Sequence, residues 1–211
     1  MTEDELQFLR DKCPYLGEEY FRFISEFRLR PREQVEVELQ LLENSEDERE
    51  PSGRIELCIK GRWVDTIFYE IPILALASET YFKYCDTDWD YTGQTENAFR
   101  KGCTLLKEAC TFSEFGTRRR RDYHTQELVL SGLCKAKQYS NQQNWLGKLS
   151  GTSNVHFAMR YNLAPVGTVA HEWYMGIAAI TDDYKNANEI ALKQWVSVFG
   201  TGVGKDYQPL D

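Results

Sequence analysis

The sequence lacks most features that would place a protein outside the cell or in a membrane. Its 211 residues include six cysteines, but none of them form a CxxC pair. The chain begins without the basic segment and apolar core of a secretory leader. The longest apolar run, residues 71–77, contains Pro72 and is far shorter than the ~20 residues that span a bilayer. We therefore expect a cytoplasmic protein with reduced cysteines and no membrane partner, and the nucleus is a second expected compartment.

The sequence also has few histidines and no net positive charge. The chain has 3 histidines, and its 25 basic residues face 33 acidic ones, which gives a formal charge of −8 and a pI near 5.1. Such a surface repels nucleic-acid backbones and anionic lipids, which argues against a general polyanion binder, so any anion site must be local. The apolar content of 42% suffices for one ordinary domain or two small ones.

In the first part of the chain the apolar period changes from helical to extended. Apolar residues recur every three or four positions through residues 6–27, which predicts helix. From residue 33 to 42 the period is two, which predicts a strand with one buried face, and residues 55–59 resume this alternation. We expect a third strand at residues 63–69 and an exposed loop at residues 44–53, which contain no apolar residue.

Later in the chain, after a broken helical stretch over residues 74–107, short strand candidates alternate with helices, which is typical of β/α folds. The predicted strands are 112–115, 151–154 and 166–170, and the predicted helices are 122–137, 155–161 and 184–199; a polar loop is expected at 139–147. The fold class is thus α/β (α+β), and we expect a partial N-terminal α+β domain over residues 1–72 and a partial α/β barrel over residues 73–211.

The first predicted strand end combines an aromatic side chain with positive charge. Functional groups collect at the carboxyl ends of parallel strands. Here Phe115 and a glycine precede the four consecutive arginines Arg118–Arg121. Guanidinium groups suit a carboxylate or phosphate, and an aromatic face beside them could hold a flat anionic ring. The alternative, a solvated helix start or a basic patch for import or nucleic acid, stays open at this point.

The other two strand ends carry weaker signals. Ser153 and Asn154 are plausible phosphate or carboxylate contacts, but a helix N-cap by one of them is the favoured interpretation. His171 follows small residues, including Thr168, and a lone histidine of this kind is usually structural. General base, nucleophile and metal ligand are its other possible roles. No second histidine or cysteine stands at metal-ligand spacing, so we expect no metal site.

Taken together, these segments closely resemble nicotinate phosphoribosyltransferases, particularly fungal ones. The motifs are Phe-Ser-Glu-Phe-Gly-Thr-Arg-Arg-Arg-Arg at 112–121, Leu-Ser-Gly-Thr-Ser-Asn at 149–154, Gly-Thr-Val-Ala-His-Glu-Trp-Tyr-Met at 167–175, and the shorter segments 65–72 and 88–91. Their order and spacing also match, and the resemblance runs from about Thr2 to about Gly200.

The resemblance implies that nicotinate is joined to phosphoribosyl pyrophosphate, which yields nicotinate mononucleotide and pyrophosphate for NAD salvage. The resemblance implies in addition that ATP hydrolysis drives the reaction, with Mg²⁺ as the counter-ion of ATP. It also implies an irregular barrel of the type II phosphoribosyltransferase kind beside an α+β domain built from sequence-distant segments. The family's site residues map onto His171 as the phosphorylated histidine, Phe115 as the ring that stacks on the pyridine, and Arg118, Thr168, Ser153 and Asn154 as further substrate contacts.

The sequence departs from the family pattern at both ends. The Asp-x-Tyr-Lys segment has no counterpart, and residues 201–211 stand where family members have Asp-Thr-Phe-Gly, Arg-x-Asp-Ser-Gly-Asp and a glycine-rich phosphate loop. We therefore expect a truncated enzyme, and the alternative is a non-catalytic nicotinate-binding or homologue-pairing fragment. Expected partners are nicotinate, phosphoribosyl pyrophosphate, ATP, a second copy of the chain or a full-length homologue, but no nucleic acid. Open strand edges and apolar faces also predict low solubility.

Overall fold

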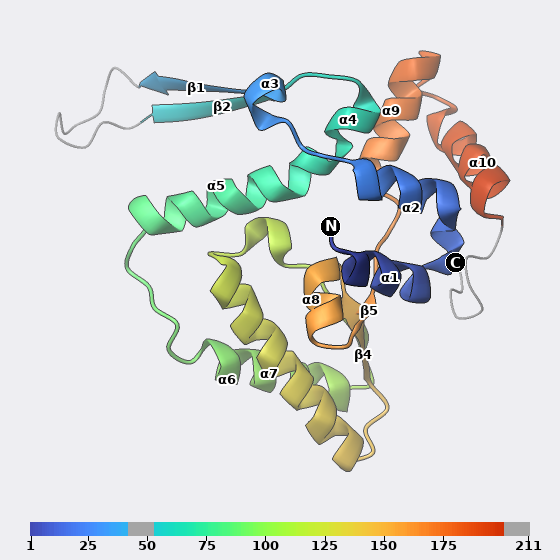
Figure 1. Ribbon diagram of the computed structural model, residues 1–211. Helices are drawn as coiled ribbons and strands as arrows, with labels where there is room; N and C mark the ends of the chain where they lie inside the picture. The colour runs from blue at the N-terminus through green and yellow to red at the C-terminus, as the bar shows by residue number, and fades with distance from the viewer. Residues whose placement is uncertain (42–52, 201–211) are drawn as a thin grey trace. The chain divides into compact units, whose positions relative to one another are not determined.

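The computed structural model describes residues 1–41 and 53–200, which divide into two compact units (Figure 1). The first unit contains residues 1–26, 95–115 and 130 onward, and the second contains residues 27–94 and 116–129. No helix in the described ranges is long and apolar enough to cross a membrane. The domain boundary expected between residues 72 and 73 stays a prediction, and each compact unit is described by itself below.

The first unit begins with two short helices, as the apolar period predicts. Helix α1, Glu3–Lys12, starts at a capping box: the Thr2 hydroxyl accepts from the Glu5 backbone N–H at 3.2 Å, and the Glu5 carboxylate accepts from the Thr2 N–H at 2.7 Å. Helix α2, Gly17–Glu26, follows the 3₁₀ turn η1, Pro14–Leu16. Both helices contribute to a small apolar core formed by Leu6, Leu9, Cys13 and Phe21.

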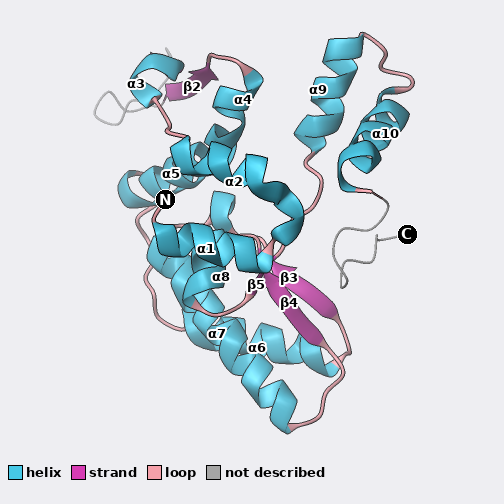
Figure 2. Cartoon of the chain, turned by 45° about the vertical axis from the view of Figure 1, so that its right-hand side comes forward, coloured by secondary structure: helices cyan, strands magenta, loops and turns pink. Residues whose placement is uncertain are grey.

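The first unit contains a parallel three-stranded sheet (Figure 2). Its strands are β3, Thr111–Glu114, β4, Lys148–Thr152, and β5, Ala164–Pro165, in the order β3-β4-β5. Helix α7, Tyr123–Gln142, lies between β3 and β4 in the sequence, and helix α8, Val155–Arg160, lies between β4 and β5. The predicted β/α alternation is confirmed. Strand β5 is shorter and earlier than the predicted 166–170, and α7 continues into the predicted polar loop.

Two glycines bring α7 close to helix α6, Gln94–Lys107. A Cβ atom at Gly102 would lie 2.8 Å from the Ala136 Cβ, and one at Gly132 would lie 2.5 Å from the Thr95 carbonyl oxygen. Because side chains at these positions would force the helices apart, glycine is required for this packing. The sequence prediction of helix through this region is confirmed.

The last two described helices, α9 and α10, form a pair. Helix α9, His171–Thr181, and helix α10, Ala187–Phe199, are joined by a turn in which Asp182 has a φ of 52°. The Trp173 indole N–H donates to the Ala191 carbonyl at 3.1 Å and links the two helices. The sequence predicted a strand at 166–170 followed by a helix at 184–199. The helix is confirmed as α10, whereas residues 166–170 form no strand and α9 was not predicted.

The second unit contains an antiparallel hairpin of strands β1, Val35–Leu41, and β2, Gly53–Ile59. Both strands were predicted, but the predicted buried face is wrong. Val37, Leu39 and Ile55 lie on one face and are 59–66% exposed, because no described segment covers them. The predicted loop at residues 44–53 lies outside the described residues except for Gly53, which begins β2.

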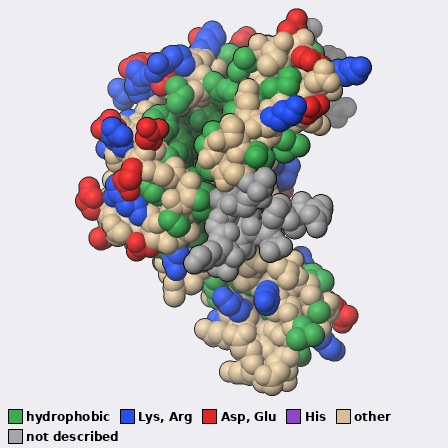
Figure 3. All heavy atoms as spheres, turned by 90° about the vertical axis from the view of Figure 1, so that its right-hand side faces the viewer, with side chains coloured by type: hydrophobic (Ala, Val, Ile, Leu, Met, Phe, Trp, Pro, Cys, Tyr) green, Lys and Arg blue, Asp and Glu red, His purple; other side chains and the backbone are tan. Residues whose placement is uncertain are grey.

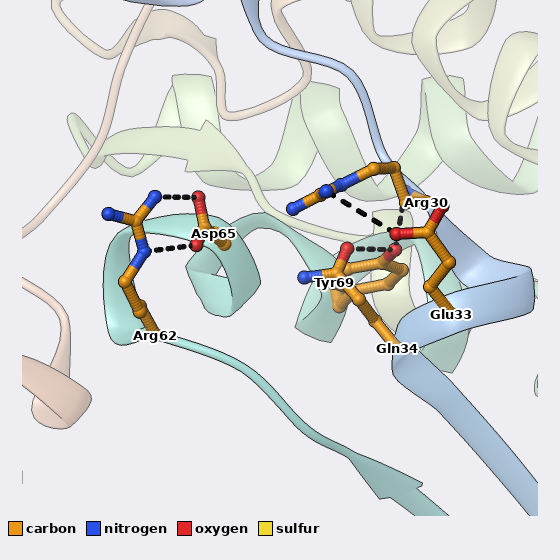
Figure 4. A network of polar contacts seen from close by, with 6 residues as sticks. All are labelled: Arg30, Glu33, Gln34, Arg62, Asp65 and Tyr69. Atoms are coloured by element: carbon orange, nitrogen blue, oxygen red, sulfur yellow. Dashed lines mark hydrogen bonds and ion pairs between the residues drawn. The ribbon is translucent and has the colours of Figure 1, made fainter.

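The predicted third strand at residues 63–69 is also wrong. These residues form a helical turn, α4, Trp63–Thr66, and a 3₁₀ turn, η2, Ile67–Tyr69, which lead into helix α5, Glu70–Tyr84. The Arg62 guanidinium pairs with the Asp65 carboxylate at 2.6 Å and closes the first turn (Figure 4). Pro72 is the third residue of α5, where its missing N–H breaks no intrahelical hydrogen bond.

A buried polar contact joins this helical segment to the base of the hairpin. The hydroxyl of Tyr69, a buried side chain, donates to the Gln34 amide oxygen at 3.0 Å and accepts from the Arg30 backbone N–H at 2.8 Å (Figure 4). Gln34 belongs to the short helix α3, Pro31–Gln34, which directly precedes β1. The hydrogen bonds of Tyr69 thereby fix the start of the hairpin against the segment that leads into α5.

Apolar side chains are exposed on other elements too. On the surface drawn in Figure 3, hydrophobic side chains are visible among charged ones. The exposed fractions include 63% for Leu76 on α5, 66% and 70% for Met175 and Ile180 on α9, and 73% for Val198 on α10. Such groups of exposed apolar side chains are typical of surfaces that another polypeptide covers.

Candidate functional site

The candidate site is built on the carboxyl edge of the β3-β4-β5 sheet. Because the three strands are parallel, their carboxyl ends lie at the same edge. Five of the six predicted site residues belong to the first unit and follow these ends in the sequence: Phe115 after β3, Ser153 and Asn154 after β4, and Thr168 and His171 after β5. The sixth, Arg118, belongs to the second unit.

A buried carboxylate holds the ends of β3 and β4 together. The hydroxyl of Thr152, which is fully buried, donates to the Glu114 carboxylate at 2.6 Å, and Glu114 is only 7% exposed. The Glu114 carbonyl accepts from the Ser153 N–H at 2.9 Å, and the Thr152 hydroxyl accepts from the Asn154 N–H at 3.1 Å. Sequence reasoning missed Glu114. The signal that could have revealed it is an acidic residue at the last position of an otherwise uncharged strand.

Asn154 caps helix α8, as the favoured interpretation of its segment predicted. Its side-chain oxygen accepts from the Phe157 backbone N–H at 3.0 Å. A ligand contact by Asn154 stays a prediction. Ser153 is half-buried beside this cap, and its roles as ligand contact remain a prediction.

His171 is the first residue of α9 and is exposed. The N-cap residue, Ala170, has no side chain that could bond the N–H groups of the first turn. A helix N-terminus favours negative charge, so a phosphate on this histidine would be electrostatically compatible with its position. Thr168 and Phe115 are exposed as well, and the exposed fraction of Phe115 is 52%.

In the second unit, the arginine run has a different environment at each position. Arg118 lies in the 3₁₀ turn η3, Thr117–Arg119, and its Nη1 atom donates to the Glu70 carboxylate at 2.5 Å. Both side chains are 33% exposed. Arg119 is exposed, and its guanidinium has no hydrogen bond or ion pair within the described part of the chain.

The last two arginines contact aromatic rings. Arg120 lies 5.4 Å from the Tyr123 ring centre and donates to the Gln126 side-chain oxygen at 3.0 Å. Arg121 lies 5.2 Å from the ring centres of both Phe82 and Trp89. These cation–π contacts and hydrogen bonds give three of the four arginines a structural partner, so the run is not simply a solvated basic patch.

Asp122, which follows the run, accepts from the Thr125 backbone N–H at 2.6 Å and from the Tyr91 hydroxyl. Burial acts to raise the pKa of Asp122, but these hydrogen bonds outweigh it and hold the pKa below its ordinary value. The same bond raises the pKa of the Tyr91 hydroxyl. The contact fixes the segment before α6 to the start of α7. Within residues 1–41 and 53–200, no group of three or more histidine, cysteine and acidic side chains could hold a metal ion.

The chain matches the models of a known protein family and several known proteins. The model of the nicotinate phosphoribosyltransferase (NAPRTase) family matches residues 110–208, and that of the NAPRTase N-terminal domain matches residues 1–78. The chain is 50% identical over 203 residues to the "Probable nicotinate phosphoribosyltransferase" of Schizosaccharomyces pombe, covering 96% of this chain and 47% of that protein. It is 44% identical to the nicotinate phosphoribosyltransferase of Saccharomyces cerevisiae, covering 86% and 42%.

Solved structures agree with the sequence comparison. A crystal structure of a protein assigned to the same family, from Saccharomyces cerevisiae, has a TM-score of 0.86 at 43% identity and covers 95% of this chain and 47% of that one. Nicotinate phosphoribosyltransferase from Porphyromonas gingivalis has a TM-score of 0.80 at 33% identity, with 97% and 47% covered. The chain spans about half the length of the curated relatives it matches. The two family models and these similarities over nearly the whole chain show that it belongs to the nicotinate phosphoribosyltransferase family.

Proposed function

We propose that the chain carries the nicotinate-binding and phosphohistidine part of a nicotinate phosphoribosyltransferase. The reaction forms nicotinate mononucleotide and pyrophosphate from nicotinate and phosphoribosyl pyrophosphate, with ATP hydrolysis. The observation that carries this proposal is the placement of Phe115, Ser153, Asn154, Thr168 and His171 after the carboxyl ends of three parallel strands. Membership of the family supplies the substrate class.

Exposed groups in each unit, taken separately, suit parts of a flat anionic ligand: Phe115 and Thr168 belong to the first unit and Arg118 to the second. Phe115 is 52% exposed, and an exposed aromatic ring suits stacking on a pyridine ring. Thr168 offers an exposed hydroxyl as a hydrogen-bond partner. Arg118 carries a partly exposed guanidinium, whose planar N–H groups match a carboxylate or a phosphate.

His171 is the proposed nucleophile for phosphate. A ring nitrogen attacks the γ-phosphorus of ATP, a nitrogen–phosphorus bond forms, the bond to the bridging oxygen breaks, and ADP leaves. Mg²⁺ bound to ATP would supply positive charge that offsets the charge of the phosphates. The phosphate is then held at the N-terminus of α9, where the partial charge of the helix favours it, until water hydrolyses it to inorganic phosphate.

In the transfer step, the pyridine nitrogen of nicotinate attacks C1 of the ribose, and pyrophosphate leaves with the electrons of the broken carbon–oxygen bond. The residues proposed above would contact nicotinate and ATP. A non-catalytic nicotinate-binding or homologue-pairing role is the second candidate, and the exposed apolar side chains on the hairpin, α9 and α10 favour pairing with another chain.

One experiment separates the candidates. The purified chain is incubated with nicotinate, phosphoribosyl pyrophosphate and Mg-ATP, nicotinate mononucleotide is measured by mass spectrometry, and His171→Ala is the control. Product that is lost in the variant supports the enzyme. Nicotinate binding by calorimetry without product supports the second candidate, and neither product nor binding contradicts both.

A further inference from the structure

Helix α5 contacts the arginine run at three positions along its length, all within the second unit. Near its start the Glu70 carboxylate accepts from Arg118 at 2.5 Å. Further along, the Ser78 hydroxyl donates to the Arg120 carbonyl at 2.8 Å, and the Phe82 ring lies 5.2 Å from the Arg121 guanidinium. The spacings of eight and four residues turn these three side chains toward a similar side of the helix. Helix α5 thus fixes the conformation of the arginine turn.

The contact between Glu70 and Arg118 differs from the other two because it engages a guanidinium that the proposed function needs. Both side chains are 33% exposed, and an ion pair with this much solvent access adds little stability. The ion pair matters more for the orientation of the Arg118 guanidinium than for stability. A guanidinium has five N–H donors in a fixed plane, and Nη1 is the atom that bonds Glu70. Once Glu70 holds that atom, the directions of the remaining donors are set before any ligand arrives.

We propose that Glu70 is a positioning residue for anion binding, which orients the Arg118 guanidinium so that its remaining N–H groups receive a carboxylate or phosphate of the ligand. The inference rests on the proposed function, in which Arg118 contacts the substrate's negative groups. Holding a side chain in its binding geometry removes part of the entropy that is otherwise lost on binding. The opposite role, in which Glu70 neutralises Arg118 and competes with the ligand, predicts the opposite sign for every Glu70 variant.

The test is calorimetric titration of the purified chain with nicotinate and, separately, with inorganic pyrophosphate. Glu70→Ala is expected to weaken binding of at least one anion by about 5-fold or more, because Arg118 loses its orientation. Glu70→Gln is expected to recover part of the loss, since its amide oxygen still accepts a hydrogen bond. Glu79→Ala is the matched control: it removes the same charge from the same helix, and Glu79 has no hydrogen bond to an arginine in the described chain.

A double-mutant cycle shows whether Glu70 acts through Arg118. In an Arg118→Ala background, Glu70→Ala should have no further effect on binding. If the unchanged chain binds an anion and Glu70→Ala binds it equally or more tightly, the inference is overturned and the proposed function still stands. If the unchanged chain binds neither anion, the proposed function fails and the inference fails with it. Should Glu70→Ala not fold, Glu70→Gln decides, because it preserves size and the hydrogen-bond acceptor.

Discussion

At the scale of single residues, the sheet edge depends on a glycine that admits no side chain. A Cβ atom at Gly151 would lie 2.0 Å from the Ala164 carbonyl oxygen. Gly151→Ala should therefore push β5 away from β4 and lower the free energy of unfolding by about 1–3 kcal/mol. Denaturant titration measures this loss. Gly167→Ala is the control, because a Cβ atom there meets nothing within 4 Å, and equal losses for both variants would contradict the explanation.

The hydroxyl of Thr152 provides a second prediction at this scale. Thr152→Val removes its hydrogen bond to the Glu114 carboxylate in a buried position, so we expect a loss of about 1–3 kcal/mol in unfolding free energy. Thr168→Val changes an exposed hydroxyl and should leave stability within about 0.5 kcal/mol. Thermal unfolding of the two variants distinguishes them. An unchanged melting temperature for Thr152→Val would show that the bond does not contribute.

Residue roles were predictable where they depend on neighbours in the sequence. Asn154 as a helix cap follows from its position before an apolar helical segment, and the structure confirms it. Glu114 was missed because its partner Thr152 lies 38 residues away, and only the pairing of β3 with β4 brings them together. The ion pair between Arg118 and Glu70, 48 residues apart, was hidden for the same reason.

At the scale of elements, Asp122 stabilises the start of α7 by accepting from the Thr125 N–H, in the manner of a helix cap. Asp122→Ala should lower the unfolding free energy by about 1 kcal/mol at neutral pH. The folded-state pKa of Asp122 is below its ordinary value of 3.8, so its charge contributes stability above that pH, and the contribution is lost as pH falls through the folded-state pKa. Denaturation curves should show that the difference in unfolding free energy between the unchanged chain and Asp122→Ala is smaller at pH 3 than at pH 7.

Asp122→Asn separates the charge from the hydrogen bond. Its side-chain oxygen can still cap the helix, so it should retain most of the stability at pH 7 while losing most of the pH dependence. A variant that is as unstable as Asp122→Ala would show that the charge, through its bonds to Tyr91 and Thr125, matters more than the cap geometry.

Elements were predicted well where a single period dominates, and poorly where tertiary contacts decide. Residues 63–69 are rich in aromatic and β-branched side chains, which favour a strand. The pair of Arg62 with Asp65 and the buried Tyr69 hydroxyl favour helical turns instead. Helix α9 was missed because its apolar residues are nearly continuous and show no helical face.

At the scale of the whole molecule, the exposed apolar face of the hairpin predicts association. Val37, Leu39 and Ile55 are largely exposed on one face, so the chain alone should form oligomers or aggregate. Replacing Val37 and Leu39 together with threonine should raise the monomer fraction in size-exclusion chromatography with light scattering. Glu38→Thr on the opposite face is the control. A wild-type chain that elutes as a stable monomer would contradict this prediction.

The fold class was predictable from the whole sequence, since the change of period and the β/α alternation together indicate a mixed α and β chain. The exposure of the apolar hairpin face was not predictable, because an alternating strand reveals that one face is apolar but not whether another segment covers it.

The interleaving of the two compact units has a consequence for synthesis on the ribosome. All residues of the second unit lie before residue 130, whereas the first unit includes the beginning of the chain and everything after Val129. Translation proceeds from the N-terminus, so the second unit is complete in sequence while much of the first has not been made. Residues 1–26 and 95–115 therefore leave the ribosome before the strands β4 and β5, which complete their unit, have been synthesised. The nascent chain therefore presents β3 as an unpaired strand, a natural substrate for chaperones.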